Sequence, residues 1–381
     1  MLNFNVYTFV IISLLFIPKY SLINIDGFYQ GVRFEDILIL VFFIIEFIKR
    51  PRIIIWPSKF FLIYIYLVVL MCVMWLSGVE QEWIVVFRGI EYFVIGQICL
   101  KTFENKKVLV NVLVTYIIIN SIIGVLQHFG LLGAFTSYTY LPSGHGWLER
   151  AYGLTGGPWE FGLTLIIAFH IIMRIGVSKS LLITLIMIIF IDLILADTRA
   201  NLIAYVLYIA YCFRNEILKR KYILFILFSL IFSSISFKFS LRYENLAKIF
   251  FELANFDLNF IDLINIDLSL SQRMNIWVDN YEIWSKSIGY MLFGIGWHSL
   301  YMESFILRLI FSFGLLGTIF IIYLYRNIDK SILLITLISG LTLDIFLSMK
   351  IFIFYLIYAK MLKDNFYIKR NEKNNYICTK Y

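Results

Sequence analysis

Long runs of apolar residues, almost free of charge, constrain the fold of this chain more than any other feature. They recur from Phe4 to Leu362, and short charged segments separate them. Apolar residues make up 61% of the 381 residues and charged residues only 15%, whereas a soluble domain carries roughly 25% charged residues. A soluble monomer with this composition would expose large apolar patches. The composition therefore predicts an integral membrane protein and argues against a soluble enzyme, a disordered protein, a coiled coil or a nucleic-acid-binding domain.

The runs predict an all-α polytopic fold with about twelve membrane-spanning helices. A span needs about 20 residues, and the strands of a membrane β-barrel would alternate apolar and polar residues, which these unbroken runs do not. The first run lacks the basic segment and cleavage site of a signal peptide, so it is predicted to be a membrane helix. The predicted spans are Phe4–Ile17, Phe34–Ile48, Phe60–Ser77, Trp83–Leu100, Val108–Gln127, Phe161–Met173, Ser180–Ala196, Ala200–Phe213, Tyr222–Phe237, Ser304–Tyr325, Ser331–Ser348 and Ile351–Leu362.

The basic residues alternate between the two sides of these spans. The even-numbered gaps between spans, together with the C-terminal end, hold 21 Lys and Arg residues. The short odd-numbered gaps hold five, namely Lys19, Arg33, Arg150, Arg199 and Lys350. Because cytoplasmic loops collect basic residues, both termini are predicted to be cytoplasmic, including a tail at 363–381. The formal charge of +8 thus reflects topology and not a nucleic-acid partner.

Residues 1–381 are predicted to form one membrane domain with a long periplasmic loop at 238–303. This loop holds five basic and eight acidic residues, and a second external segment covers about 128–160. Short amphipathic helices are expected in the long loop, because one helical face would carry Met274, Trp277, Val278, Tyr281 and Trp284. Any chemistry is expected in these two external segments.

Three arginines on the external side are candidate phosphate ligands, because that side is otherwise poor in basic residues. Arg150 precedes the turn Gly153–Pro158, which leads into a predicted helix whose free N–H groups favour an anion. The alternative is a simple re-entry turn in which Arg150 pairs with Glu149 or Glu160.

Arg199 stands in a turn that is predicted to lie below the external surface. The two spans around it share only residues 180–213, and two helices of about 17 residues reach roughly 25 Å each, less than the ~30 Å hydrocarbon core. A cation at that depth needs a partner, which is either a phosphate or a carboxylate of Asp197 or Asp192. The two are compatible, since a carboxylate can orient the guanidinium.

Arg273 lies near the start of a predicted helix for which Ser271 is a plausible N-cap. An anion at that position would meet both the side chain and the positive end of the helix dipole. The alternative is a cation–π contact between Arg273 and Trp277, one turn further on.

Other charged residues lie inside or next to the spans. Arg88 and Glu91 are three apart on one helix and are expected to form an intramembrane salt bridge. Glu303 and Arg308 begin the helix after the long loop, where Glu303 is either a helix-dipole partner or a catalytic group. His298 is an external candidate proton acceptor or a solvated side chain. The His and Cys residues have no ligand spacing, so no metal site is predicted.

Short segments along most of the chain form a recognisable pattern. They are Gly31-Val-Arg-Phe-Glu-Asp36, Phe87-Arg-Gly-Ile-Glu-Tyr92, Arg150-Ala-Tyr-Gly-Leu-Thr-Gly-Gly-Pro158, Ala196-Asp-Thr-Arg-Ala200, Ser271-Gln-Arg-Met-Asn-Ile-Trp277, Leu292-Phe-Gly-Ile-Gly-Trp297 and Gly314-Leu-Leu-Gly317. In this order the segments resemble the bacterial O-antigen polymerase and ligase family. The chain departs from the pattern at Trp159, where Asn or Ser is common, and at Thr198, which replaces Ser.

The resemblance implies a glycosyltransferase of the bacterial inner membrane that needs no metal, cofactor or nucleotide sugar. It would move a glycan from a polyprenyl diphosphate on the periplasmic face, with a polyprenyl-diphosphate-linked oligosaccharide, membrane lipid and a chain-length regulator as partners. The diphosphate would lie near Arg150, Arg199 and Arg273, and Glu303 or His298 would assist proton removal. Supporting roles fall to Arg88, Glu91, Pro158, Trp277 and Arg308.

One departure favours the polymerase branch over the ligase branch. Ligase members carry a His eleven residues before the closing Gly-Leu-Leu-Gly, and Glu303 occupies that position here, with His298 five residues too early. The expected function is therefore an O-antigen polymerase, whose acceptor is a lipid-linked repeat unit. The alternatives are a ligase to the lipid A core, a lipid-linked oligosaccharide flippase or transporter, and a non-enzymatic scaffold.

Overall fold

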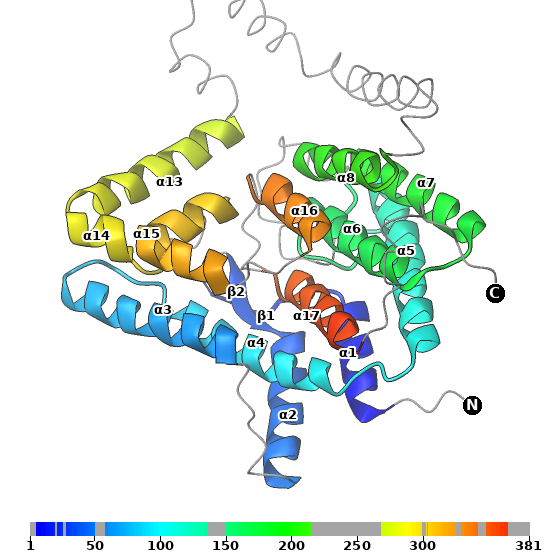
Figure 1. Ribbon diagram of the computed structural model, residues 1–381, viewed down its shortest axis with the longest axis horizontal. Coiled ribbons are helices and arrows are strands. Elements are labelled where there is room, and N and C mark those ends of the chain that lie inside the picture. The colour runs from blue at the N-terminus through cyan, green and yellow to red at the C-terminus, as the bar shows by residue number, and fades with distance from the viewer. Residues whose placement is uncertain are drawn as a thin grey trace, which may run out of the picture.

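The computed structural model describes residues 5–19, 21–25, 28–49, 58–133, 135, 150–214, 268–298, 302, 304–324, 329–341 and 348–364. Within these ranges, nearly all of the regular structure is helical (Figure 1). The elements in chain order are α1 (Val6–Phe16), β1 (Ser21–Ile25), β2 (Phe28–Arg33), α2 (Phe34–Lys49), α3 (Ser58–Leu76), α4 (Ile84–Leu100), α5 (Lys106–His128), α6 (Pro158–Ile175), α7 (Lys179–Leu195), α8 (Arg199–Cys212), α13 (Leu268–Ser285), α14 (Ile288–Phe293), α15 (Phe305–Leu324), α16 (Lys330–Gly340) and α17 (Met349–Lys363).

The helical fold predicted from the apolar runs is confirmed. A helix lies at each predicted span except Tyr222–Phe237, which falls outside the described residues. Three helices are long and apolar enough to cross a membrane, namely Lys106–His128, Pro158–Ile175 and Phe305–Tyr323. Several other apolar helices are shorter, among them Val6–Phe16 and Lys330–Gly340. The described part of the 238–303 loop contains α13 and α14.

A small β-hairpin between α1 and α2 was not expected in an all-α fold. Strands β1 and β2 are antiparallel, and Ser21 is paired with Arg33 and Ile25 with Phe28. The hairpin directly precedes α2, and the backbone N–H of Arg33 donates to Asp36 Oδ2 over 2.8 Å. The pairing therefore ties the start of α2 to the end of β2.

Helix α6 forms the centre of the larger helix group. Every residue from Phe161 to Met173 is buried, because α5, α7, α8, α16 and α17 all pack against α6 (Figure 1). A helix that is apolar on all sides is stable in such a central position. The segment 151–157 that leads into α6 is buried as well.

Side chains of α5 satisfy the backbone of this buried segment. Gln127 accepts from the N–H of Tyr152 over 2.9 Å and donates to the carbonyl of Gly153 over 3.1 Å. Asn120 Oδ1 accepts from the N–H of Leu154 over 2.9 Å. Buried backbone groups need such partners, so the polar residues of α5 allow an irregular turn to lie inside the helix group.

A smaller group packs α14 and α15 against α3 and α13 (Figure 1). The backbones of Gly294, with φ 94°, and Gly314, with φ 66°, approach each other closely where the path of α15 is interrupted. The N–H of Ile295 donates to the carbonyl of Phe311 over 2.9 Å, and Tyr66 Oη donates to the carbonyl of Phe293 over 2.8 Å. Both glycines are needed here, because positive φ is unfavourable for other residues.

The segments that connect the helices meet in two sets. In the first set, the connections after α1, α5, α7 and α16 contact one another, through Lys19–Glu160, Arg150–Asp197 and Lys350. In the second set, Asn5 before α1 donates to the carbonyl of Lys101 after α4, and Arg174 at the end of α6 pairs with Asp329 before α16.

Candidate functional site

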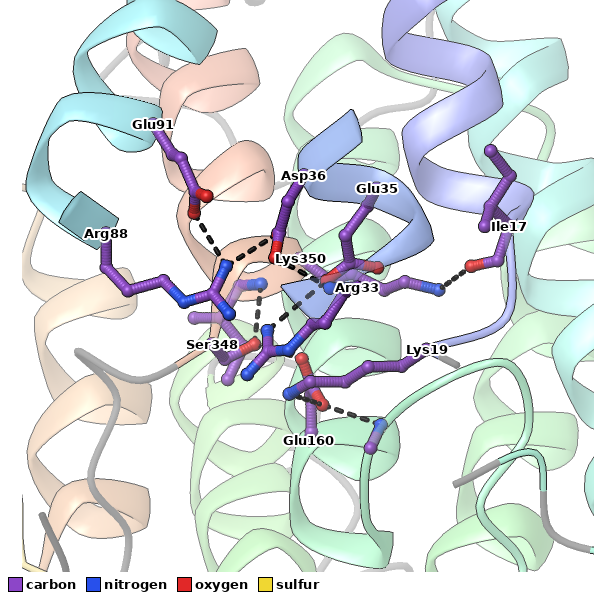
Figure 2. Close-up of polar contacts among 12 residues, drawn as sticks. Ile17, Lys19, Arg33, Glu35, Asp36, Arg88, Glu91, Glu160, Ser348 and Lys350 are labelled. Carbon is purple, nitrogen blue, oxygen red and sulfur yellow. Dashed lines mark hydrogen bonds and ion pairs between the residues drawn. The ribbon is translucent and has the colours of Figure 1, made fainter. Parts of the chain in front are cut away.

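Eight ionisable side chains cluster near the connections of the first set (Figure 2). They are the four cations Lys19, Arg33, Arg88 and Lys350 and the four carboxylates Glu35, Asp36, Glu91 and Glu160. They come from the end of α1, the hairpin, and helices α2, α4, α6 and α17. Charged groups away from water must be paired, and in this cluster equal numbers of both signs lie together.

Arg88 connects two carboxylates from different helices. Its Nη1 lies 2.6 Å from Asp36 Oδ1 and 2.7 Å from Glu91 Oε2. The salt bridge predicted between Arg88 and Glu91 is confirmed. Asp36, the second partner of Arg88, was not predicted. Arg33 Nη1 lies 3.3 Å from Glu35 Oε1 on the same side of the cluster.

Glu160, in the first turn of α6, receives three hydrogen bonds and is fully buried. Its Oε2 accepts from Lys19 Nζ over 3.2 Å and from the N–H of Gly156 over 2.7 Å. Its Oε1 accepts from Ser348 Oγ. Burial lowers the pKa of the Lys19 ammonium below its ordinary value, although the charge of Glu160 acts in the opposite direction. The carboxylate thus joins three connections that are far apart in the sequence.

Lys350, in the first turn of α17, holds three carbonyls. Its Nζ donates to the carbonyls of Leu15, Ile17 and Leu154 over 3.2, 2.7 and 2.6 Å. The first two carbonyls lie at the C-terminal end of α1, where the helix dipole favours a cation. Through the third, Lys350 fixes the turn that follows Arg150.

Arg150 pairs with a residue other than those expected. Its Nη2 lies 3.3 Å from Asp197 Oδ2, whereas the expected partner Glu160 is held by Lys19, and Glu149 lies outside the described residues. Asp197 has φ 51°, a conformation that Asp tolerates better than most residues. Its backbone turn brings the carboxylate toward Arg150. Tyr152, two residues after Arg150, is buried, and burial raises the pKa of its hydroxyl to about 12, although the charge of Arg150 opposes this shift.

The other two candidate arginines are described only in their backbone. Arg199 begins α8 and Arg273 lies in α13, and their side chains fall outside the described part of the structure. The expectation that both arginines reach one phosphate site therefore stays a prediction. Of the carboxylates expected near Arg199, Asp197 pairs with Arg150, and Asp192 accepts from Ser121 Oγ.

A second group of polar residues surrounds Trp297, next to α15. The guanidinium of Arg308 is fully buried and lies 4.3 Å from the centre of the Trp297 ring. His298 Nδ1 lies 3.0 Å from the carbonyl of Glu80. Glu303, the first candidate base, lies outside the described residues. Trp277 Nε1 donates to the carbonyl of Met302 over 2.5 Å, so this ring helps to fix the start of α15.

Pro158 occupies the first turn of α6, a position where its missing N–H costs no helical hydrogen bond. The charge pattern assigned Lys19 and Lys350 to the external side without a role for either residue, and it did not indicate the contact between Asp36 and Arg88. Within the described ranges, no three His, Cys, Asp or Glu side chains are grouped so that they could hold a metal ion.

A scan against known protein-family models and a search of curated proteins found no match for this chain.

Proposed function

We propose that this chain is a surface-polysaccharide polymerase of the bacterial inner membrane, of the O-antigen polymerase type. The observation that carries the proposal is that six of the seven segments on which the family resemblance rests contact one another in three pairs. Segment 31–36 meets 87–92 through Asp36 and Arg88, and 150–158 meets 196–200 through Arg150 and Asp197. Segment 292–297 meets 314–317 at Gly294 and Gly314. Such contacts between segments that are far apart in the sequence are expected if their residues support a common function.

The contacts between helix connections support a topology of about twelve spans with cytoplasmic ends. The first set joins connections that the charge pattern assigns to the periplasm, and the second set joins connections assigned to the cytoplasm. Gln81, in the third connection, donates to the carbonyl of Ile295. In the proposed topology, this contact is explained by one further span between Cys212 and Ile295, for which Tyr222–Phe237 is the candidate.

The chemistry that we propose is transfer of the growing glycan from its polyprenyl diphosphate. The terminal hydroxyl of an incoming lipid-linked repeat unit attacks the anomeric carbon, and the diphosphate departs. Arg150, with Arg199 and Arg273, binds the diphosphate, since guanidinium groups form paired hydrogen bonds with phosphate oxygens. The same charges stabilise the departing anion as the C–O bond breaks. Glu303 or His298 assists removal of the proton.

A lipid-linked oligosaccharide transporter is the second candidate, and the buried ionic cluster is the observation that favours it. Ionisable residues inside a membrane domain often mark proton or substrate pathways. In this cluster, however, Glu160, Asp36 and Glu91 each have a cationic partner within 3.2 Å. The arrangement of fixed pairs around the turn before α6 fits a rigid support for a site better than a moving relay.

Surface polysaccharide from a strain that lacks the gene tests the proposal. We expect loss of long chains and retention of a band that carries one repeat unit. Absence of the repeat unit from the mature glycolipid would point to the ligase or the flippase, and an unchanged ladder would contradict a role in glycan assembly. Complementation with Arg150→Glu is expected to leave the single-repeat phenotype, while the protein remains in the membrane.

A further inference from the structure

The segment 77–83, between α3 and α4, docks on the segment that follows α14. Gln81 Nε2 donates to the carbonyl of Ile295 over 3.0 Å, and Gln81 Oε1 accepts from the N–H of Trp297 over 2.9 Å. The N–H of Glu82 donates to the carbonyl of Trp297 over 2.9 Å. These bonds fix Glu82 beside Trp297 and His298, although more than 200 residues separate them in the sequence.

The Glu82 carboxyl group is half-buried among charged groups from three segments. It lies within electrostatic range of His298, of Arg308 on α15 and of Glu80 on its own segment. Arg308 is fully buried against Trp297, so its charge is fixed behind this site. The arrangement unites a carboxylate, an imidazole and a guanidinium at one end of α15.

The surroundings change the proton affinity of Glu82, and a hydrogen bond orients the His298 ring. Burial raises the pKa of Glu82, and Glu80 acts in the same direction, while His298 and Arg308 oppose the shift. A carboxylate with a raised pKa is a stronger base than an ordinary one. His298 Nδ1 faces the carbonyl of Glu80, which can only accept, so in the neutral ring Nδ1 carries the proton and Nε2 is the acceptor nitrogen.

We propose that Glu82 is a further catalytic residue, and that Glu82, in place of Glu303 or His298, accepts the proton of the attacking hydroxyl in the polymerase reaction proposed above. In this step, the acceptor O–H bond breaks and its proton passes to the Glu82 carboxylate. The new bond from this oxygen to the anomeric carbon forms as the bond from that carbon to the phosphate oxygen breaks. The electron pair leaves with the polyprenyl diphosphate, and Glu82 later returns the proton to water. The inference rests on the proposed function.

The depth of the site suits an acceptor at the membrane surface. Trp75 at the end of α3 and Trp83 before α4 are exposed, and their rings lie 6.3 Å apart in an edge-to-face arrangement. Tryptophan side chains of this kind concentrate at membrane–water interfaces. Glu82 precedes Trp83 and is therefore within reach of the glycan of a lipid-linked molecule.

The test is the pH dependence of polymerisation by the full-length protein in lipid nanodiscs, with the lipid-linked repeat unit from the deletion strain as substrate. For the wild type, the rate is expected to fall as the pH drops through the pKa of Glu82, because the protonated carboxyl group cannot accept a proton. Glu82→Gln is expected to lower the rate by about 100-fold or more. It is also expected to remove the fall in rate at low pH, which is the acid limb of the pH profile. Glu82→Asp keeps the carboxylate and is expected to retain the acid limb at a reduced rate.

Glu282→Gln is the matched control, because Glu282 is exposed on α13 and the chemical change is the same. It is expected to keep the rate and the pH profile of the wild type. A wild-type rate with an intact acid limb in Glu82→Gln would overturn the inference while polymerisation by the wild type still supports the proposed function. Loss of rate in Glu82→Asp together with loss of its thermal transition would assign Glu82 a structural role and would also overturn the inference. Failure of the wild-type protein to form polymer would instead refute the function itself.

Discussion

The guanidinium of Arg150 lies 3.3 Å from the carboxylate of Asp197, and this pair joins the turn before α6 to the turn before α8. Both side chains are mostly covered, with 19% and 24% of their area exposed. An arginine that is held in this way presents its remaining N–H groups in a fixed direction. Asp197 therefore acts as a positioning residue for the candidate phosphate ligand.

Asp197→Asn is expected to lower the rate of polymerisation by about tenfold to 100-fold, since a charge-assisted hydrogen bond is worth about 1.5–3 kcal/mol. Asn tolerates the left-handed backbone of this position, so the substitution removes the charge without adding strain. The loss should appear mainly as weaker substrate binding, measured as a higher KM for the lipid-linked substrate. Asp279→Asn, on the exposed side of α13, is the control. A KM equal to that of the wild type would exclude the positioning role.

Arg88→Met is expected to lower the free energy of unfolding by about 3 kcal/mol, because it leaves the largely covered carboxylates of Asp36 and Glu91, 13% and 20% exposed, without their cation. The triple variant Asp36→Asn, Arg88→Met, Glu91→Gln removes all three charges and should recover most of this loss. Thermal unfolding in one detergent compares the proteins. Equal stability of the single variant and the wild type would show that the buried pairs do not form.

Gly294→Ala is expected to prevent correct packing of α14 on α15. A Cβ atom at this position would lie 2.5 Å from the backbone nitrogen of Gly314, and φ 94° is unfavourable for alanine. The expected result is loss of the monodisperse peak in size-exclusion chromatography. Gly96→Ala is the matched control in α4, since a Cβ there meets no atom within 4 Å. Normal behaviour of Gly294→Ala would contradict the close backbone approach.

Lys350→Met is expected to destabilise the protein by about 3 kcal/mol, because buried carbonyls that lose their donor cost about 1–3 kcal/mol each. The hydrocarbon part of the side chain is retained, so the effect reports the three hydrogen bonds to Leu15, Ile17 and Leu154. Lys330→Met removes an exposed lysine and should change the stability by less than about 0.5 kcal/mol. Similar melting temperatures for the two variants would argue against a stabilising role of the three hydrogen bonds that Lys350 donates.

The long apolar runs predicted the helices, because a helix satisfies its backbone hydrogen bonds within one segment of the chain. The boundaries of α5, Lys106–His128, differ by two residues at its start and one at its end from the predicted Val108–Gln127. The hairpin between α1 and α2 was missed, although Asp26-Gly27 separates its strands and is a common hairpin signal. The apolar character of the flanking residues hid this signal within a predicted membrane domain.

The partners of the charged residues were harder to predict than the helices. Arg88–Glu91 lies within one helical turn, so its spacing alone indicated the contact. Lys19 and Glu160 are 141 residues apart, and Asp197, which pairs with Arg150, lies 47 residues further along the chain. Such pairs depend on how the helices pack, which short-range patterns do not encode. The charge alternation nevertheless assigned Lys19, Arg150 and Lys350 to one side, and these residues lie in one set of contacting connections.

Reconstituted polymerisation tests the central claim most directly. The purified protein in nanodiscs is mixed with the single-repeat polyprenyl-diphosphate oligosaccharide that accumulates in the deletion strain, and the products are separated by mass. The account predicts oligosaccharides of two and more repeats together with free polyprenyl diphosphate, and strongly reduced amounts with Arg150→Glu. Substrate that stays unchanged in the presence of folded wild-type protein would contradict it.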